Sequence, residues 1–207
     1  SSITYQKKEN IMSTTQPIKS TEALERFRNY YFLQKPKPRN GTLIILGLNT
    51  ALRISDVLLL KWGDVYDEEK GKAKDYLEVV EKKTGKNCRI ALNQAVRVVL
   101  QNYWEFTFQG KGYEREQYLF LSQKGKNEPI SRSQAYRIIC AAAKASGLEK
   151  HISCHSLRKT FGYHAWKQGT PPALLMDIYN HSSYEVTKRY LGIDQEERDE
   201  VYLKISL

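Results

Sequence analysis

One segment of this chain, residues 76–92, has the character of β-strand, while the apolar residues around it follow helical spacing. Residues 76–81 and 87–92 are β-prone, and between them stands the basic sequence KKTGK at positions 82–86. Two such runs joined by a short connection that contains glycine are typical of an antiparallel hairpin. The sequence therefore predicts an α+β fold that is mainly α-helical and carries a small antiparallel β-hairpin with a basic tip.

Helices account for most of the remaining chain, because apolar residues repeat every three or four positions between turn-forming residues. Side-chain caps are predicted to start three of these helices, from Ser55, from Ser131 with Gln134, and from Ser182 with Glu185. The expected helices cover residues 21–35, 43–49, 56–62, 96–103, 131–146, 155–168, 171–179 and 184–191.

The first 20 residues are polar, lysine-bearing and weakly periodic. We expect residues 1–20 to form a tail or linker, or to include a cloning remnant before Met12. Residues 21–207 are long enough to form one domain with a substantial core. The chain is also strongly basic, with 33 Lys and Arg against 23 Asp and Glu and a net charge of +10. This excess predicts a polyanionic partner, although a lysine-rich surface that only maintains solubility is an alternative.

The cysteines and the apolar runs indicate the compartment. Three cysteines, Cys88, Cys140 and Cys154, are odd in number and widely spread, so they predict a reducing environment and no disulfide framework. The apolar runs at 43–48 and 57–60 are too short to cross a bilayer, and the N-terminus lacks the apolar stretch of a secretion signal. We therefore expect a cytoplasmic, nucleoid-associated protein without a membrane partner.

Six residues spread along the chain have the chemistry to act on a phosphodiester. Arginine and lysine complement its negative charge, imidazoles transfer protons, and a phenol can attack phosphorus. Two of the six stand three positions apart, so that on a helix they share one face. We interpret the set as a candidate site for cutting and rejoining DNA without a metal ion. Its members are Arg53, Lys83, His155, Arg158, His181 and Tyr190.

Each of these residues has a simpler explanation when it is taken alone. An isolated His-x-x-Arg is usually a surface pair, and Arg53 is compatible with an ordinary helix-end arginine. The chain has 14 tyrosines, so that only its position distinguishes Tyr190. His151, Cys154 and His155 lack a second Cys/His pair that would complete a metal site, so we expect no metal, and no phosphate-binding glycine loop indicates a nucleotide cofactor.

Taken in order, the segments resemble the catalytic signature of phage-integrase-type tyrosine recombinases. The matching segments are TALRISD at 50–56, KTG at 83–85, HSLR at 155–158, and His181 followed nine positions later by Tyr190. Five separated matches are much harder to obtain by accident than one. The resemblance covers residues 21–207 and implies the catalytic-domain fold of this family.

The resemblance implies a role for each matching residue. Tyr190 would attack the scissile phosphate and form a 3′-phosphotyrosine link with a free 5′-hydroxyl, without metal or ATP. Arg53 and Arg158 would hold the nonbridging oxygens, and Lys83 would protonate the departing 5′-oxygen. Lys82 and Lys86 are rivals for that lysine role.

The remaining roles concern protons, support and DNA contacts. By the same resemblance, His155 would assist proton transfer from Tyr190, and His181 would hydrogen-bond a phosphate oxygen. Asp56 would orient the site from behind the arginine, although an acid near a helix N-terminus is favourable without any catalysis. Further DNA-binding candidates are Lys82, Lys86 and Arg132.

The sequence departs from the family pattern at two places. Asn180 stands where the family commonly has glycine before the last histidine, and asparagine tolerates the left-handed backbone that such a turn requires. No N-terminal DNA-clamping domain precedes the catalytic part, so we expect either a fragment or a minimal recombinase. Asp194 and Glu197 have the spacing to begin a last helix, and the apolar side chains that follow it are expected to dock on a neighbouring protomer. They are Val201, Tyr202, Leu203, Ile205 and Leu207.

The sequence as a whole predicts a site-specific DNA recombinase or integrase of a mobile element. By resemblance, its partners would be double-stranded DNA and other recombinase protomers, as a tetramer on synapsed DNA and as a monomer alone. Two alternatives stay open: a type IB topoisomerase-like enzyme that nicks and reseals, and a non-catalytic DNA-binding accessory protein.

Overall fold

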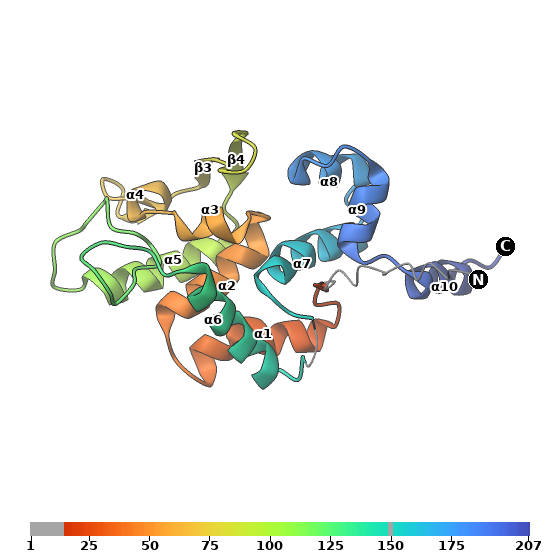
Figure 1. The fold of residues 1–207 in the computed structure, drawn as a ribbon, viewed down its shortest axis with the longest axis horizontal. Helices are drawn as coiled ribbons and strands as arrows, with labels where there is room; N and C mark the ends of the chain where they lie inside the picture. Colours follow the sequence, from red (N-terminus) through yellow and green to blue (C-terminus); the bar gives the residue numbers. More distant parts are fainter. Residues whose placement is uncertain (1–14, 149–150) are drawn as a thin grey trace, which may run out of the picture.

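The computed structural model describes residues 15–148 and 151–207. Its strands form two antiparallel pairs, β1 (Tyr66–Asp67) with β2 (Lys72–Ala73) and β3 (Tyr76–Val80) with β4 (Asn87–Ala91). The mainly helical α+β class is confirmed (Figure 1). The helices are α1 (Thr21–Leu33), α2 (Pro38–Thr50), α3 (Ile54–Leu58), α4 (Trp62–Val65), α5 (Gln94–Phe108), α6 (Arg132–Ala145), α7 (Cys154–Lys167), α8 (Pro172–Tyr179), α9 (Tyr184–Leu191) and α10 (Gln195–Lys204).

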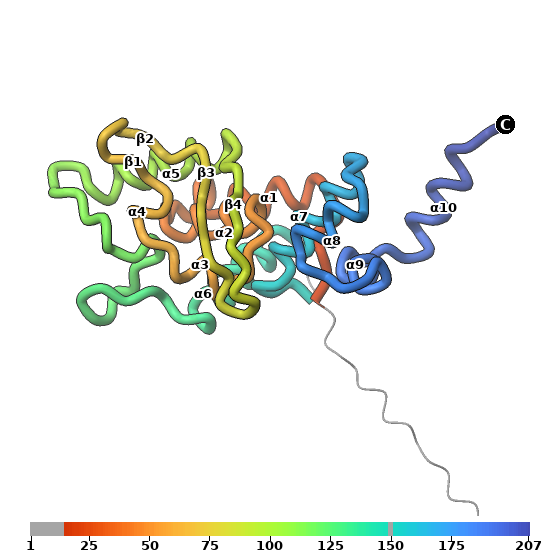
Figure 2. The backbone as a smooth tube through the Cα atoms, turned by 90° about the horizontal axis from the view of Figure 1, so that it is seen from above, coloured from red at the N-terminus to blue at the C-terminus, as the bar shows by residue number. Residues whose placement is uncertain are grey.

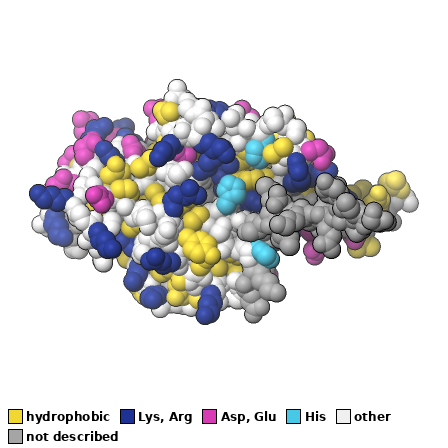
Figure 3. Space-filling view, viewed as in Figure 1, with side chains coloured by type: hydrophobic (Ala, Val, Ile, Leu, Met, Phe, Trp, Pro, Cys, Tyr) yellow, Lys and Arg dark blue, Asp and Glu magenta, His cyan; other side chains and the backbone are white. Residues whose placement is uncertain are grey.

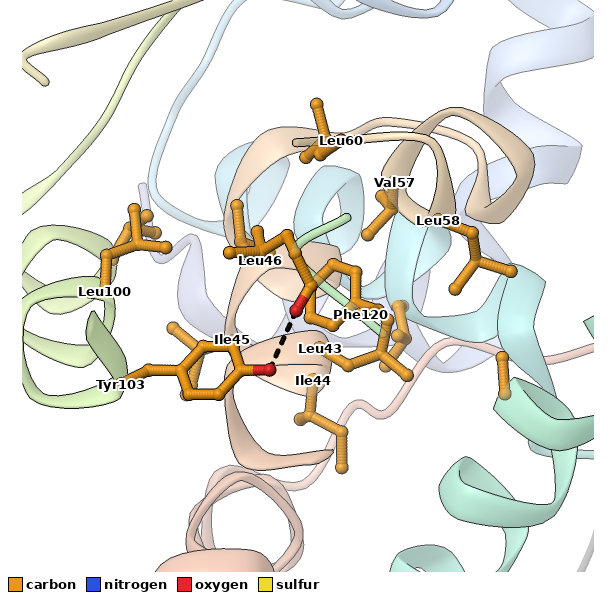
Figure 4. Close-up of a cluster of buried hydrophobic side chains, with 14 of the residues drawn as sticks. Leu43, Ile44, Ile45, Leu46, Val57, Leu58, Leu60, Leu100, Tyr103 and Phe120 are labelled. Carbon is orange, nitrogen blue, oxygen red and sulfur yellow. Dashed lines mark hydrogen bonds between the residues drawn. The ribbon is translucent and has the colours of Figure 1, made fainter. Parts of the chain in front are cut away.

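The larger core is built around α2, which α1, α5 and α7 surround. Four consecutive apolar residues of α2, at 43–46, are buried because a helix enclosed on several sides has no polar face to keep. Tyr103 of α5 closes this core, and its hydroxyl donates to the Leu119 carbonyl at 2.8 Å (Figure 4). Val57 and Leu58 of α3 are buried in the same cluster. The core therefore fixes α3, and with it Arg53 at the start of that helix.

A second, smaller core holds α8 and α9 against α7. Tyr179 and Leu191 are fully buried in it, and Gly162 of α7 faces both. A Cβ at Gly162 would collide with the Tyr179 hydroxyl and crowd Leu191, so glycine is needed for this close approach. Because Tyr190 precedes Leu191, this packing also sets how far the Tyr190 ring stands from α7.

The predicted hairpin is confirmed as β3 and β4. Its register runs from Tyr76 opposite Ala91 to Val80 opposite Asn87, which leaves residues 81–86 as the tip. Leu77 is fully buried while the residues on either side of it are exposed, so one face of the hairpin packs on the helical body. Figure 1 shows the hairpin and α8 on the same side of that body.

Two of the three predicted caps are wrong by one or two residues. α3 begins at Ile54, because Arg53 is already the extended N-cap residue and its carbonyl accepts the Val57 N–H at 3.1 Å. The predicted helix over 56–62 is therefore two short helices, α3 and α4. In α9 the capping hydroxyl belongs to Ser183 instead of Ser182. The cap at Ser131 is confirmed.

Residues 15–20 pack on the body, which differs from the expected tail. Ile18 is only 1% exposed, and its backbone binds α7 at both ends, with the N–H donating to Thr160 Oγ1 at 2.9 Å and the carbonyl 2.8 Å from His164 Nε2. Lys159 Nζ donates to the Thr15 carbonyl at 2.6 Å. Sequence periodicity could not reveal a single buried isoleucine. The rest of the expected tail, residues 1–14, lies outside the described residues.

The last helix, α10, projects from one end of the molecule (Figures 1 and 2). Asp194 and Glu197 begin this helix as predicted, and the structure shows that they do so as a capping box. Lys19 anchors this start, since its Nζ donates to the Gly192 carbonyl at 2.8 Å and to Glu197 Oε1 at 2.7 Å. In the part of the chain that the structure describes, no helix has the length and apolar character needed to span a membrane.

Candidate active site

Arg158 is the buried centre of the candidate site. This residue of α7 is only 2% exposed to solvent. Its Nε donates to the Ala51 carbonyl at 2.6 Å. Nη1 donates to the Tyr190 hydroxyl at 3.3 Å. Nη2 is buried and has no hydrogen-bond partner among the described residues. Because an unpaired buried donor is costly, this nitrogen is suited to receive an acceptor such as a phosphate oxygen.

Tyr190 lies among three rings from α7, α8 and the turn after α8. Its ring centroid is 5.1 Å from that of His155 on α7, 5.0 Å from His181 after α8, and 4.8 Å from Tyr179 in α8. Burial raises the pKa of Tyr190, while the charge of Arg158 opposes that rise. The hydroxyl therefore stays protonated at neutral pH, and it needs a proton acceptor before it can act as a nucleophile.

His155 is the candidate for that acceptor. Desolvation, followed by the charges of Lys159 and Arg158, lowers the pKa of His155 to about 4, although one side of the residue is open to solvent. Protonation is disfavoured first because burial removes hydration from the charged ring, and second because several cations stand near it. The structure thus places a neutral imidazole beside a protonated phenol, with 5.1 Å between the two ring centroids.

His181 is fixed by a turn and by a hydroxyl. Asn180 has a left-handed backbone with φ 55°, which confirms that asparagine supports the turn expected before this histidine. The Nδ1 of His181 is 3.0 Å from the buried Thr187 Oγ1. Desolvation, followed by the charge of Arg158, lowers the pKa of His181. The ring is thus held in one orientation and is neutral at neutral pH.

Arg53 enters the site from the start of α3. Its Nη1 donates to Glu81 Oε2 at 3.0 Å, and Glu81 is buried at the base of the hairpin tip. The charge of Arg53 contributes to the lowered pKa of both His155 and His181, so Arg53 lies near the same two histidines as Arg158. The structure therefore brings both arginines, both histidines and the tyrosine of the predicted site together.

Asp56 contacts the hairpin. Its Oδ1 accepts the Lys82 N–H at 2.9 Å, and its buried Oδ2 has no hydrogen-bond partner within residues 15–148 and 151–207. Asp56 therefore holds the strand end that leads to Lys83, and its own N–H donates to the Arg53 carbonyl at 2.9 Å. The supporting role expected for Asp56 stays a prediction.

The three lysines of the hairpin tip differ in their partners. Lys86 Nζ donates to the Asp177 carbonyl of α8 at 2.9 Å and lies 3.4 Å from Asp177 Oδ1. Lys83 is exposed, and its side chain has neither a hydrogen bond nor an ion pair with any described residue. Its charge nevertheless contributes to the lowered pKa of His155. Lys83 is thus near the pocket and uncommitted, and the side chain of Lys82 is exposed as well.

Arg132 lies at the start of α6, beside the pocket. It lines an open hollow of about 460 Å³ together with Tyr136, Arg137, Cys154 and His155. On the face shown in Figure 3, Lys and Arg side chains extend across the body, histidines lie among them, and acidic side chains gather toward the left end. A basic hollow that opens beside His155 suits a backbone phosphate of a polyanion.

Sequence reasoning missed three residues that shape the site. Glu81 binds Arg53, Thr187 binds His181, and Lys159 lies with its Nζ 5.3 Å from the Tyr190 ring centroid. Glu81 could have been predicted, because it is an acid at the edge of a basic hairpin tip. Nothing in the sequence predicts that Thr187 contacts His181. The described stretches contain no group of three or more His, Cys, Asp or Glu side chains suited to a metal ion.

Known proteins similar to this chain come from one family. Residues 15–197 match the Phage integrase family. The "Probable integrase/recombinase YoeC" of Bacillus subtilis is 43% identical over 185 residues, which are 89% of this chain and 93% of YoeC. Tyrosine recombinase XerA of Pyrococcus furiosus is 26% identical over 162 residues, 78% of this chain and 52% of XerA, so the chain spans about half the length of that relative.

Solved structures share the fold. A crystal structure of XerA recombinase superposes with a TM-score of 0.72 at 19% identity, over 94% of this chain and 68% of that one. The XerH site-specific recombinase bound to difH substrate in a pre-cleavage complex gives a TM-score of 0.66 at 21% identity, over 97% of this chain and 55% of XerH. Together with the match over residues 15–197 and the likeness to YoeC, the fold and the convergent side chains lead to one assignment: the chain belongs to the phage integrase family of tyrosine recombinases.

Proposed function

We propose that this protein is a site-specific DNA recombinase that cuts and rejoins strands through a phosphotyrosine intermediate. The observation that carries the proposal is the 3.3 Å hydrogen bond from Arg158 Nη1 to the Tyr190 hydroxyl. It sets a permanent positive charge beside the phenol, where a phosphate under attack would develop negative charge. The fold of the XerH complex with difH substrate supports DNA as the partner.

The cleavage step needs one nucleophile and two proton transfers. The Tyr190 oxygen forms a bond to phosphorus, the bond from phosphorus to the 5′-oxygen breaks, and the 3′-phosphate stays on the tyrosine. The phenol proton passes to neutral His155, and the Lys83 ammonium gives a proton to the leaving 5′-oxygen. One phosphodiester is exchanged for another, so that no ATP is required, and attack by a 5′-hydroxyl reverses the step.

The two arginines would hold the nonbridging oxygens during this step. Arg158 offers Nη2, and Arg53 offers the guanidinium nitrogens that Glu81 does not bind. Removing one preorganised donor of this kind raises the barrier by about 2.7–4 kcal/mol, a factor of about 10² to 10³ in rate. His181, oriented by Thr187, would hydrogen-bond one of the same oxygens.

DNA would lie across the basic face beside the pocket, where Lys82 and Arg132 would contact its backbone. Neutralising several phosphates makes binding fall steeply with salt. The exposed apolar residues after Glu200 would dock on a second protomer. Through this contact, four protomers would assemble on two DNA sites, while the protein without DNA would be a monomer. These residues are Val201, Tyr202, Leu203, Ile205 and Leu207.

A covalent adduct tests the proposal directly. The protein is incubated with nicked suicide substrates drawn from a pool of sequences, and adducts are resolved by denaturing electrophoresis. We expect an adduct that Tyr190→Phe abolishes and Arg158→Ala sharply reduces. The matched control is Tyr184→Phe, which removes an exposed hydroxyl at the start of the same helix and should leave the adduct intact.

Three results would contradict the proposal. An adduct that persists in Tyr190→Phe would mean that another residue is the nucleophile. Relaxation of supercoiled DNA that lacks any special site, without partner exchange, would favour the topoisomerase-like alternative, and salt-sensitive binding without any adduct would favour an accessory protein.

A further inference from the structure

Glu81 is a buried acid at the base of a basic hairpin tip. Only 3% of the residue is exposed, directly after β3. Its N–H donates to the Lys86 carbonyl at 2.9 Å, and its own carbonyl accepts the Gly85 N–H at 2.8 Å, so its backbone closes the tip. A carboxylate buried this deeply requires partners that offset its lost hydration. Its backbone position is therefore fixed, and its side chain is committed to a specific contact.

One oxygen of Glu81 joins two parts of the candidate site. Oε2 accepts from Arg53 Nη1 at 3.0 Å and from Thr84 Oγ1 at 2.7 Å. Thr84 directly follows Lys83, the uncommitted lysine of the tip. The same carboxylate thus binds the arginine assigned to the phosphate and the loop segment that carries the lysine assigned to the leaving oxygen.

The exposed fractions of the Arg53 and Glu81 side chains indicate which partner is the more rigidly fixed. The Arg53 side chain is 18% exposed against 3% for Glu81, so the acid is the fixed partner of the pair. Glu81 is the one hydrogen-bond partner of the Arg53 side chain among the described residues, which leaves its other nitrogens available. An arginine held at one nitrogen loses less freedom when the others bind a phosphate.

We propose that Glu81 is a positioning residue, which orients Arg53 toward the scissile phosphate and, through Thr84, sets Lys83 at the leaving oxygen. This inference rests on the proposed recombinase function and adds to it a residue that touches neither phosphate nor leaving group. The opposite arrangement, in which Glu81 competes with DNA for Arg53, predicts faster cleavage when the acid is neutralised.

The first test compares Glu81→Gln with the matched control Glu78→Gln. Glu78 is an exposed acid on β3, the strand that leads to Glu81, and its contact is a surface pair with Arg89 at 3.8 Å. In single-turnover cleavage of a suicide substrate at saturating DNA, we expect Glu81→Gln to slow adduct formation by about 10- to 100-fold. The control should stay within about 2-fold of wild type. Unchanged or faster cleavage by Glu81→Gln overturns the proposal.

The second test uses a readout that general damage to the fold would not change. A methylphosphonate at the scissile position removes the nonbridging charge that Arg53 meets. We expect the ratio of wild-type to Glu81→Gln rates to narrow on this substrate to the part that acts through Lys83, and Glu81→Gln to cost less in the Arg53→Ala background than in wild type. An equal deficit on both substrates, or additive losses in the double variant, overturns the positioning role.

The third test concerns Thr84 and separates the two proposals. Thr84→Val removes one donor to Glu81, and its deficit should shrink on a 5′-phosphorothiolate substrate, whose sulfur leaves without a proton from Lys83. If Glu81→Gln unfolds below the assay temperature, Thr84→Val takes its place in the first test. If wild type forms no adduct, both proposals fail. If wild type cleaves, Arg53→Ala does not, and both Glu81→Gln and Thr84→Val behave as wild type, only the positioning role fails.

Discussion

Arg158 Nε donates to the Ala51 carbonyl across 2.6 Å, and this bond joins the end of α2 to α7. Ala51 has a left-handed backbone with φ 57°, which costs a residue with a side chain about 1–2 kcal/mol. The hydrogen bond helps to hold that conformation. In return, the guanidinium is fixed in the plane that directs Nη1 at Tyr190.

Arg158→Lys should therefore lose most activity although it keeps the charge. A single ammonium group cannot reach Ala51, Tyr190 and a phosphate with the fixed geometry of a guanidinium. We expect adduct formation to slow by about 10² to 10³, measured in single turnover. Arg28→Lys, an exposed change on α1, is the matched control. A lysine variant with near wild-type cleavage would mean that charge alone suffices at this position.

Lys83→Ala and Lys86→Ala should separate the rival lysines of the hairpin. Lys86 is engaged with Asp177, while Lys83 is free of partners among the residues described. We expect only Lys83→Ala to block cleavage of ordinary DNA, and a 5′-phosphorothiolate substrate to restore its rate because sulfur needs no general acid. The measurement is adduct formation on both substrates. Restoration of Lys86→Ala instead would reverse the assignment.

Gly162→Ala should destabilise the fold and displace the nucleophile. The added Cβ collides with the Tyr179 hydroxyl, and such overpacking typically costs about 1–3 kcal/mol. We expect a lower free energy of unfolding in urea and slower adduct formation. Gly112→Ala, where nothing lies within 4 Å of the new Cβ, is the control. An unchanged free energy of unfolding for Gly162→Ala would show that α8 and α9 can move away at little cost.

The lowered pKa of His155 predicts how stability depends on pH. The unfolded histidine binds a proton near its ordinary pKa of 6.5, while the folded one does so only near 4. Acidification from pH 6.5 to 4 therefore favours the unfolded state through this residue. We expect the free energy of unfolding of His155→Gln, taken relative to that of wild type, to be higher at pH 5 than at pH 7. The difference in urea unfolding between the two proteins measures it, and a pH-independent difference would contradict it.

Lys19→Ala should loosen the start of α10. Lys19 binds the Gly192 carbonyl and the buried Glu197, and hydrogen bonds to charged groups contribute about 1.5–3 kcal/mol. We expect faster amide hydrogen exchange throughout α10 with little change in the rest of the molecule. Lys204→Ala, whose partner Glu200 is half exposed at 3.4 Å, is the control. Equal exchange in both variants would mean that other contacts hold the helix.

The sequence predicted the elements whose signals are local. The hairpin follows from β-prone runs that flank a glycine-containing tip, and the helices from apolar spacing. The predicted starts of helices were less accurate. Arg53 is the N-cap of α3 but makes no side-chain cap hydrogen bond, so the sequence instead pointed to the hydroxyl of Ser55. The convergence of Arg158 with Tyr190 was predicted only through the ordered motifs, since nothing local links residues 32 positions apart.

The contacts that support the site were out of reach for the same reason. Glu81 meets Arg53 across 28 positions, and Ile18 meets Thr160 across 142. Such pairs depend on how the hairpin and α7 are placed in space, which propensity and spacing do not encode. Thr187 is six positions from His181, yet the turn at Asn180 decides whether the two side chains meet.

Arg158 Nη2, which has no hydrogen-bond partner within residues 15–148 and 151–207, links substrate binding to the thermal stability of the protein. An anion that binds this donor stabilises only the folded chain, so the melting temperature rises with anion concentration according to mass action. The protein without DNA should therefore melt at a lower temperature than the protein bound to DNA. Thermal protection by short duplexes is consequently a way to find the recognition sequence before any strand is cut.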